Sequence, residues 1–309
     1  MRIVVGVDGS NASLTALGLV TRTAWPAGTR IRLVTAYDLP VRWSGIALPP
    51  SEVINDEQAA QDRRDNLDAL AGPLRRKDYP TETVLVQGRP ADILLAEADE
   101  LRADLVVVGS RGLGVTASAL LGSVSGALVD HAPCPVLVAR GEAVTRILLA
   151  TDGSQSAEAI PAVLLAWKVF RDAPIDVLSV ARPTNVGDGA VLVAGLMSGG
   201  TWPSDASHEV DRYRVLANEM AGRLRAGGWH ADGRVRDGEA AQEIEAAAAE
   251  WGADLIITGS RGLSGLRRLL LGSVAHHVLL HSRSSVLVMR GHVPARQTRA
   301  VRLPNAVNA

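Results

Sequence analysis

The stretch GSRGLGVTASALLGSV, residues 109–124, returns later in the same chain as GSRGLSGLRRLLLGSV, residues 259–274. Each copy follows a short apolar run with β-branched residues, DLVVVG at 104–109 and DLIITG at 254–259. Runs of this kind are typical of strands that are buried on both faces of a sheet. Helical periodicity follows each glycine stretch. The sequence therefore predicts the same glycine-rich connection between a buried strand and a helix, written twice.

Other segments recur in the same order, which indicates a duplicated domain and not a short repeat. RIVVGVDGS at 2–10 returns as RILLATDGS at 146–154, and CPVLVAR at 134–140 returns as SSVLVMR at 284–290. The offset between the copies grows from 144 residues at the first pair (152 − 8) to 150 at the glycine stretch (259 − 109). The second copy therefore holds about six additional residues between these motifs.

We predict two tandem α/β domains followed by a tail without strand or helix pattern. The predicted bounds are 1–140, 146–290 and 291–309. Within each copy five short apolar runs alternate with longer helical stretches, which favours parallel βαβ units. Each domain is expected to be an open, parallel, five-stranded sheet of the flavodoxin-like or Rossmann-like kind, with helices on both faces. Ligands of such sheets bind outside the carboxyl ends of the strands.

Two further structural expectations concern irregular segments and sheet edges. The stretches 40–60 and 183–208 are rich in Pro, Gly and Trp, and we expect a lid or an interface segment there. The last strands of the two copies, PVLVAR and SVLVMR, would be exposed apolar edges if they were left alone. Because folds usually cover such edges, we expect these strands to pair with each other.

The composition is that of an ordinary globular protein. The 309 residues are 47% hydrophobic and 21% charged, with a net charge of −1. A near-neutral chain argues against a dedicated nucleic-acid binder. Cys134 is the single cysteine, so an intramolecular disulfide is excluded. No apolar run reaches the roughly 20 residues of a membrane span, and no signal-peptide pattern opens the chain, so we expect a soluble cytoplasmic protein.

The glycine stretch has the chemistry of a phosphate cradle. Gly109 and Gly112 are expected to turn the backbone with positive φ and to leave room for a phosphate. Gly122 and Ser123 open the following helix, whose free N–H groups and positive dipole end favour an anion. The hydroxyls of Ser123 and Ser125 are expected to donate further hydrogen bonds. Asp8, after the first strand, is expected to face the same crevice from a neighbouring strand.

Other glycine motifs fit this chain poorly. A Walker A loop requires a lysine after its second glycine, and the only lysines, Lys77 and Lys168, lie away from the glycine stretches. The first strand ends in GVDGS and not in G-x-G-x-x-G. The serines of GSVSG are misplaced for a nucleophile elbow, and no histidine lies beside either glycine loop. Catalysis therefore has little support in the sequence.

The spacing Gly109, Gly112, Gly122-Ser123 resembles the G-2x-G-9x-G-(S/T) motif of ATP-binding universal stress proteins. The second copy matches at Gly259, Gly262, Gly272 and Ser273. The resemblance extends from Met1 to about Arg290, in the tandem-domain form of the family. It implies a regulatory protein of stress or growth arrest that binds ATP with Mg²⁺, two ATP per chain. It also implies a homodimer and a protein partner that the sequence does not name.

The resemblance assigns ATP-binding positions residue by residue. Asp8 and Asp152 are the expected metal ligands, although DGS is also common turn and helix-cap chemistry. Arg111 and Arg261 are expected either to reach a phosphate or to be solvated. The nucleotide-binding positions of the first copy are Gly6, Asp8, Ala36, Val108, Gly109, Ser110, Arg111, Gly112, Leu113, Gly114, Gly122, Ser123, Val124 and Ser125. Those of the second copy are Ala150, Asp152, Val180, Thr258, Gly259, Ser260, Arg261, Gly262, Leu263, Gly272, Ser273, Val274 and Ala275.

Two alternatives stay open at this point. One is an ATP-cleaving enzyme of a related adenine-nucleotide α-hydrolase-like group, which would need an acid/base pair or nucleophile. The other is a chaperone-like module that has lost its nucleotide. If both copies bind ATP, we expect the first to bind more tightly, since Ser125 offers a hydroxyl where the second copy has Ala275.

The histidines give no metal site by sequence alone. His276 and His277 are adjacent and cannot share one helix face. His281 lies four residues after His277, the spacing of two zinc ligands on a helix, but no third ligand is evident nearby. The sequence therefore predicts no zinc site here.

Overall fold

The computed structural model describes residues 1–37, 50–112, 121–181, 205–260, 262 and 271–290. Strands and helices alternate through both copies, as predicted. The first copy consists of β1 Arg2–Gly6, α1 Asn11–Arg22, β2 Arg30–Tyr37, α2 Pro50–Arg75, β3 Thr81–Gln87, α3 Pro90–Glu100, β4 Leu105–Gly109, α4 Ser123–His131 and β5 Val136–Ala139. The second consists of β6 Ile147–Ala150, α5 Gln155–Glu158, α6 Ile160–Trp167, β7 Ile175–Ala181, α8 Asp205–Ala226, β8 Ala231–Asp237, α9 Ala240–Trp251, β9 Leu255–Gly259, α10 Ser273–His281 and β10 Ser285–Met289.

The strands form one continuous sheet across both copies. Its order is β3-β2-β1-β4-β5-β10-β9-β6-β7-β8. All pairs within a copy are parallel, whereas β5 and β10 are antiparallel, with Leu137 opposite Leu287. The predicted pairing of the last strands is therefore confirmed. The two five-stranded sheets expected from the sequence merge into ten strands because each last strand covers the edge of the other.

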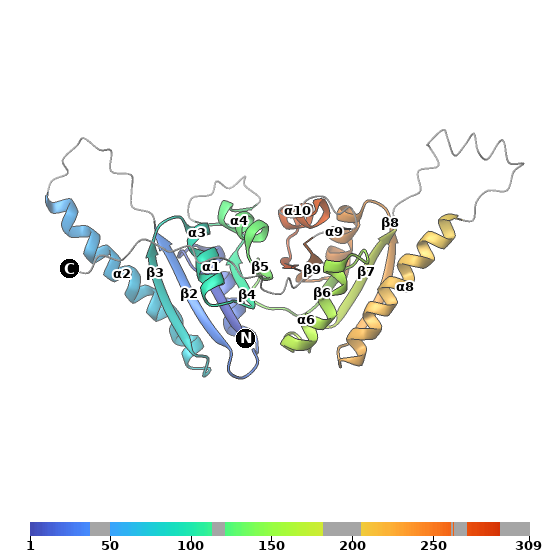
Figure 1. Ribbon diagram of the computed structural model, residues 1–309, viewed down its shortest axis with the longest axis horizontal. Helices are drawn as coiled ribbons and strands as arrows, with labels where there is room; N and C mark the ends of the chain where they lie inside the picture. The colour runs from blue at the N-terminus through green and yellow to red at the C-terminus, as the bar shows by residue number, and fades with distance from the viewer. Residues whose placement is uncertain (38–49, 113–120, 182–204, 261, 263–270, 291–309) are drawn as a thin grey trace, which may run out of the picture.

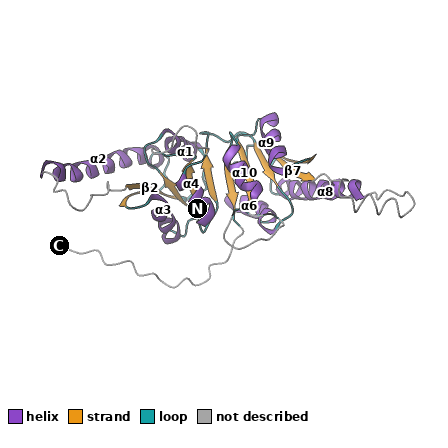
Figure 2. Cartoon of the chain, turned by 90° about the horizontal axis from the view of Figure 1, so that it is seen from above, coloured by secondary structure: helices purple, strands orange, loops and turns teal. Residues whose placement is uncertain are grey.

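Helices cover both faces of this sheet. Alternate strand residues point to opposite faces, so Ile3 and Val5 lie in one apolar core while Val4 lies in the other. The first core holds residues of α1, α2, α6 and α8, and the second holds residues of α3, α4, α9 and α10. Figure 1 shows the strands through the middle of the molecule with α2 and α8 at its two ends. Seen from above, these two long helices extend in opposite directions along the long axis (Figure 2).

Some local expectations need correction. Residues 50–60, expected to be irregular, form the beginning of α2, and residues 205–208 belong to α8. Proline at the first turn of α2 is compatible with a helix, because its missing N–H would have no partner there. The rest of the two irregular segments and the tail 291–309 lie outside the described residues. Among the described residues, no helix is long and apolar enough to cross a membrane.

One arginine after the last strand of each copy contacts the last helix of the other copy. Arg140, directly after β5, donates to the carbonyl oxygens of Leu279 in α10 and of Ser284. Arg290, directly after β10, donates to the carbonyl oxygen of Val129 in α4. Val129 and Leu279 correspond in the two copies, so these contacts are reciprocal. Cations at helix C-termini stabilise the unpaired carbonyl groups found there.

Candidate functional site

The glycine connection begins at the carboxyl end of β4, beside β1. In the first copy the Gly122 N–H donates to the Ser110 carbonyl at 2.8 Å, so the loop returns to its own start before α4 begins. The second copy repeats this contact from Gly272 to Ser260 at 2.9 Å. The same closure in both copies places the N-terminus of α4 or α10 next to the end of a parallel strand. This is the end of the sheet at which the sequence predicted a binding crevice.

The aspartate after the first strand lies against the glycine loop, as predicted. A Cβ atom placed on Gly112 would lie 2.7 Å from Oδ2 of Asp8, and one on Gly262 would lie 3.0 Å from Oδ2 of Asp152. The other carboxylate oxygen of each aspartate accepts the N–H of the residue two positions later, Ser10 or Ser154, at 2.9 Å. The aspartates therefore combine both interpretations: each holds a turn and also faces the loop.

Gly109 and Gly112 are glycines because other groups approach them closely. Neither has the positive φ that the sequence interpretation expected. Gly109 and Gly112 are absent from the positive-φ residues of the described chain, which include Gly9 and Gly153 of the DGS turns. A Cβ atom on Gly109 would lie 2.4 Å from the backbone carbon of Ala12. Gly109 is thus required because the first turn of α1 crosses directly over the end of β4.

The helices after the glycine loops begin without a side-chain cap. Gly122 and Gly272 occupy the N-cap positions of α4 and α10, and neither helix receives a side-chain hydrogen bond there. In contrast, the Ser10 hydroxyl of α1 accepts the Ser13 N–H at 3.2 Å. Ser123 and Ser273, the first helical residues, are exposed. The first-turn N–H groups of α4 and α10 are therefore suited to an anion.

Ser125 does not fulfil its predicted role. Its side chain is buried, and its hydroxyl donates to the Gly109 carbonyl oxygen at 2.7 Å. The single hydroxyl proton is then committed to the backbone of the loop and is not offered to a phosphate. Ala275 occupies the corresponding position in α10. The expected advantage of the first site, which rested on this hydroxyl, loses its physical basis.

The remaining predicted positions surround the same strand ends. Gly6 lies in contact distance of Val108 and Leu94, since a Cβ atom there would be 3.0 Å from each side chain. Ala150 and Thr258, the corresponding residues of the second copy, are buried. Ala36 is half-buried near the end of β2, and Val180 is buried near the end of β7. Val124 and Val274 are half-buried in the first turns of α4 and α10. Leu113, Gly114, Arg261 and Leu263 lie outside the described residues.

Positive charge gathers beside the first glycine loop. Arg111 is exposed directly after Gly109-Ser110. Burial, together with the charge of Arg111, lowers the pKa of Arg140 to about 10. Arg111 and Arg140 follow the carboxyl ends of β4 and β5, which are neighbouring strands of the sheet. An anion bound there would relieve the repulsion between the two guanidinium groups.

One pair of residues near the site was missed by the sequence interpretation. The Thr35 hydroxyl donates to the Val7 carbonyl at 2.7 Å, and the Ser179 hydroxyl donates to the Thr151 carbonyl at 2.9 Å. Each bond ties the turn before the aspartate to the neighbouring strand. Thr35 and Ser179 are 144 residues apart, the same offset as Asp8 and Asp152. This repeated hydroxyl residue is the signal that could have identified them from the sequence.

Comparison with known proteins finds relatives that match both copies. The profile of the universal stress protein family matches residues 1–140 and again 143–290. A universal stress protein of Mycobacterium tuberculosis (strain ATCC 25618 / H37Rv) is 28% identical over 300 residues, covering 93% of this chain and 96% of the relative. A shorter universal stress protein of Thermus aquaticus is 35% identical over 138 residues, covering 45% of this chain and 97% of its own length.

Solved structures share the fold over almost the whole chain. The crystal structure of a universal stress protein from Archaeoglobus fulgidus has a TM-score of 0.63 at 18% identity, and the superposition covers 94% of this chain and 98% of that one. A structure described as a putative universal stress protein from Pseudomonas aeruginosa has a TM-score of 0.56 at 18% identity, covering 94% and 92%. At this identity the likeness concerns the fold alone.

Proposed function

Since this chain belongs to the universal stress protein family and consists of two copies of its domain, we propose that it is a nucleotide-binding regulator with one ATP site in each copy. The observation that carries the proposal is the meeting of three groups at the carboxyl edge of each parallel half. These are an aspartate carboxylate, a glycine loop and a helix N-terminus without a side-chain cap.

The phosphates would bind to backbone groups. The N–H groups at the beginning of α4 and α10 supply donors and the positive end of the helix dipole. Gly109 brings α1 against β4, and Gly112 leaves space beside Asp8. Arg111 adds positive charge in the first copy. These features support binding of a polyphosphate without any lysine in the loop.

The residues present also fit a divalent metal. A carboxylate that lies against a phosphate loop would repel the phosphates unless a cation stood between them. Asp8 and Asp152 each present Oδ2 toward the glycine loop, and oxygen ligands together with phosphates are the usual environment of Mg²⁺. Mg²⁺ would supply charge neutralisation of the bound phosphates. Asp8 and Asp152 are the residues that would hold it.

We propose binding and not turnover as the activity. No histidine occurs in the sequence of either glycine connection, so neither connection carries one as a general base. Ser125, in the first turn of α4, donates its hydroxyl proton to the backbone. ATP would then act as a ligand that stabilises the loop and helix arrangement of each copy, by mass action.

The first experiment is nucleotide analysis of the purified, heat-denatured protein, followed by calorimetry with ATP and Mg²⁺ on nucleotide-free protein. We expect a stoichiometry of two. Asp8→Ala and Asp152→Ala should each remove one site and leave the other, because the two aspartates belong to different crevices. Asp104→Ala serves as control: this carboxylate, which accepts the Arg2 N–H at 2.7 Å, precedes β4 and lies away from both loops.

Three outcomes would decide against parts of the proposal. Absence of bound nucleotide, together with no thermal shift on adding ATP, would favour the nucleotide-free module. Steady conversion of ATP to AMP with a defined acceptor would establish an enzyme. A stoichiometry of one that either aspartate variant abolishes would indicate a single shared site.

A further inference from the structure

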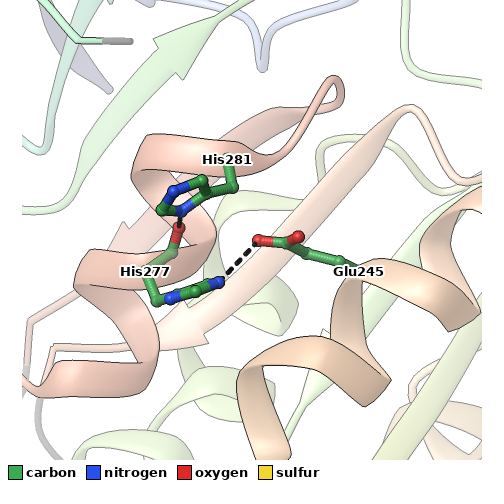
Figure 3. A group of neighbouring side chains, drawn as sticks. All are labelled: Glu245, His277 and His281. Carbon is green, nitrogen blue, oxygen red and sulfur yellow. Dashed lines mark hydrogen bonds and ion pairs between the residues drawn. The ribbon is translucent and has the colours of Figure 1, made fainter.

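A second kind of site lies on the helices of the second copy, away from the glycine loop. Glu245 projects from α9 toward His277 and His281 on α10, as Figure 3 shows. One ligand atom from each of these side chains lies within 4.8 Å of the other two. The sequence predicted no metal site because the third ligand, Glu245, precedes His277 by 32 residues. The packing of α9 against α10 places Glu245 beside the two histidines.

The cluster is specific to one copy. At an offset of 150 residues the first copy has Leu95 in place of Glu245 and Ala127 in place of His277, while His131 corresponds to His281. Leu95 is part of the apolar packing between α3 and the sheet. The same helix pair therefore exists without these polar groups, and the fold does not require them. Both changes, to glutamate and to histidine, occur together in the second copy.

One carboxylate oxygen of Glu245 has no hydrogen-bond partner among the described residues. Oε1 of Glu245 is buried and accepts no hydrogen bond from the described residues. Leaving such a buried acceptor unpaired is unfavourable. Nε2 of His277 lies 3.6 Å from this oxygen, too far for a good hydrogen bond. Two ligands of one tetrahedral zinc ion, with bonds of about 2.0–2.1 Å, stand about 3.4 Å apart. The observed separation is close to that spacing.

The two histidines lie one helical turn apart on α10. Their rings stack with centroids 4.2 Å apart on one face of α10. A ring nitrogen of His281, Nδ1, lies 3.0 Å from the His277 carbonyl oxygen. Because a carbonyl oxygen only accepts, Nδ1 carries the proton and Nε2 keeps the lone pair. A backbone carbonyl that fixes the tautomer of a histidine is the common support of a metal-bound imidazole.

We propose that Glu245, His277 and His281 bind a divalent transition-metal ion of the zinc class, with water at the remaining position. Two imidazoles and one carboxylate suit zinc and its neighbours, and disfavour Mg²⁺ and Ca²⁺, which take oxygen ligands. The ion connects α9 to α10. Leu279 of α10 is also the residue whose carbonyl accepts from Arg140 of the first copy, so the metal stiffens a helix that both copies contact.

The test uses the full chain, stripped with a chelator and free of nucleotide, titrated calorimetrically with ZnCl₂. We expect one zinc per chain, and a visible absorption band of tetrahedral character when Co²⁺ replaces zinc. The double variant Glu245→Leu/His277→Ala restores the pair that the first copy has, so it should fold. It should weaken zinc binding by at least tenfold. His131→Ala, the matched change in the first copy, should leave binding unchanged.

A gain of binding gives the sharper result. Leu95→Glu/Ala127→His places the same pair beside His131, and this variant should raise the stoichiometry to two. Zinc should also raise the melting temperature of the wild type and not that of Glu245→Leu/His277→Ala. A wild type that takes up no zinc would overturn the proposal. So would a Glu245→Leu/His277→Ala variant that binds zinc as the wild type does.

Discussion

The two glycines that open the glycine loops, Gly109 and Gly259, occupy corresponding positions but have different surroundings. A Cβ atom on Gly109 would overlap backbone of α1, at 2.4 Å from the Ala12 carbon and 2.7 Å from the Ser13 nitrogen. A Cβ atom on Gly259 would meet Ser156 Oγ at 2.4 Å, and the backbone nitrogen of Ala157 only at 3.1 Å. A hydroxyl moves aside by rotation about χ1, whereas a helix turn does not.

We therefore expect Gly109→Ala to destabilise the protein by about 1–3 kcal/mol, as overpacking does, and Gly259→Ala to cost clearly less. Urea denaturation of both variants measures the difference. Equal losses would show that the crowding at Gly109 is relieved by a shift of α1. For the nucleotide titration this difference makes the aspartate variants the better-matched pair.

At the residue scale, the sequence predicts which residues are neighbours better than it predicts why each residue type is needed. The motif spacing identified Gly109, Gly112 and Asp8 as neighbours, and the structure confirms it. The positive φ expected at these glycines was wrong; Gly109 is required by the approach of α1 to β4, a tertiary contact that no local pattern encodes. The role of Ser125 failed for the same reason: whether a hydroxyl faces a ligand or a carbonyl depends on a helix orientation that the spacing leaves open.

At the scale of helices and strands, α6 ends under strain. Its C-cap residue, Lys168, has φ 56° and ψ 27°, the left-handed conformation. Glycine is the usual residue there, and Gly252 fills this position at the end of α9 with φ 67°. The second copy thus shows both solutions, a lysine at the end of α6 and a glycine at the end of α9.

Lys168→Gly should stabilise the protein by about 1 kcal/mol, because glycine enters the left-handed region without a Cβ clash. Lys168→Ala is the matched control: it removes the same side chain but keeps the Cβ atom, and it should give no gain. Thermal unfolding followed by circular dichroism compares the two. Equal melting temperatures for both variants would show that the backbone at residue 168 is not strained.

Elements were largely predictable because buried parallel strands and their crossover helices have strong, separate periodicities. The strands β4, β5, β9 and β10 lie within the apolar runs from which they were predicted. The first turns of α2 and α8 were missed, since Pro, Gly and Trp in the preceding residues signal loops. Glu245 was missed as a partner of His277 because a contact between two helices is not written in the sequence around either residue.

At the scale of the whole molecule, β5 and β10 hold the copies together. Leu137 and Leu287 lie directly opposite each other and are both fully buried in the same core. Cys134 stands just before β5, and burial, with a smaller contribution from Asp104, raises the pKa of its thiol to about 12. At pH 8 the folded thiol is then almost wholly protonated and unreactive, so its modification reports opening of this region.

Leu287→Ala should destabilise the protein by about 2–5 kcal/mol, the usual range for a buried leucine. The thiol of Cys134 should become reactive at lower urea concentration, although Leu287 belongs to the other copy. Leu164→Ala, in α6 and outside the β5–β10 pair, is a control of similar burial. If Leu287→Ala leaves the urea dependence of Cys134 modification unchanged, the copies unfold independently and the pairing of β5 with β10 does not couple them.

The antiparallel pairing of β5 with β10 also decides how the halves meet. A protein with one copy of this domain must find a second molecule before it can cover its last strand, so its assembly is lost on dilution. Here the link between the last strand of one half and the first strand of the next spans only residues 140–146. A short link of this kind keeps the partners at an effective concentration of about millimolar. The pairing of β5 with β10 therefore forms within each single chain and does not depend on the concentration of the protein in the cell.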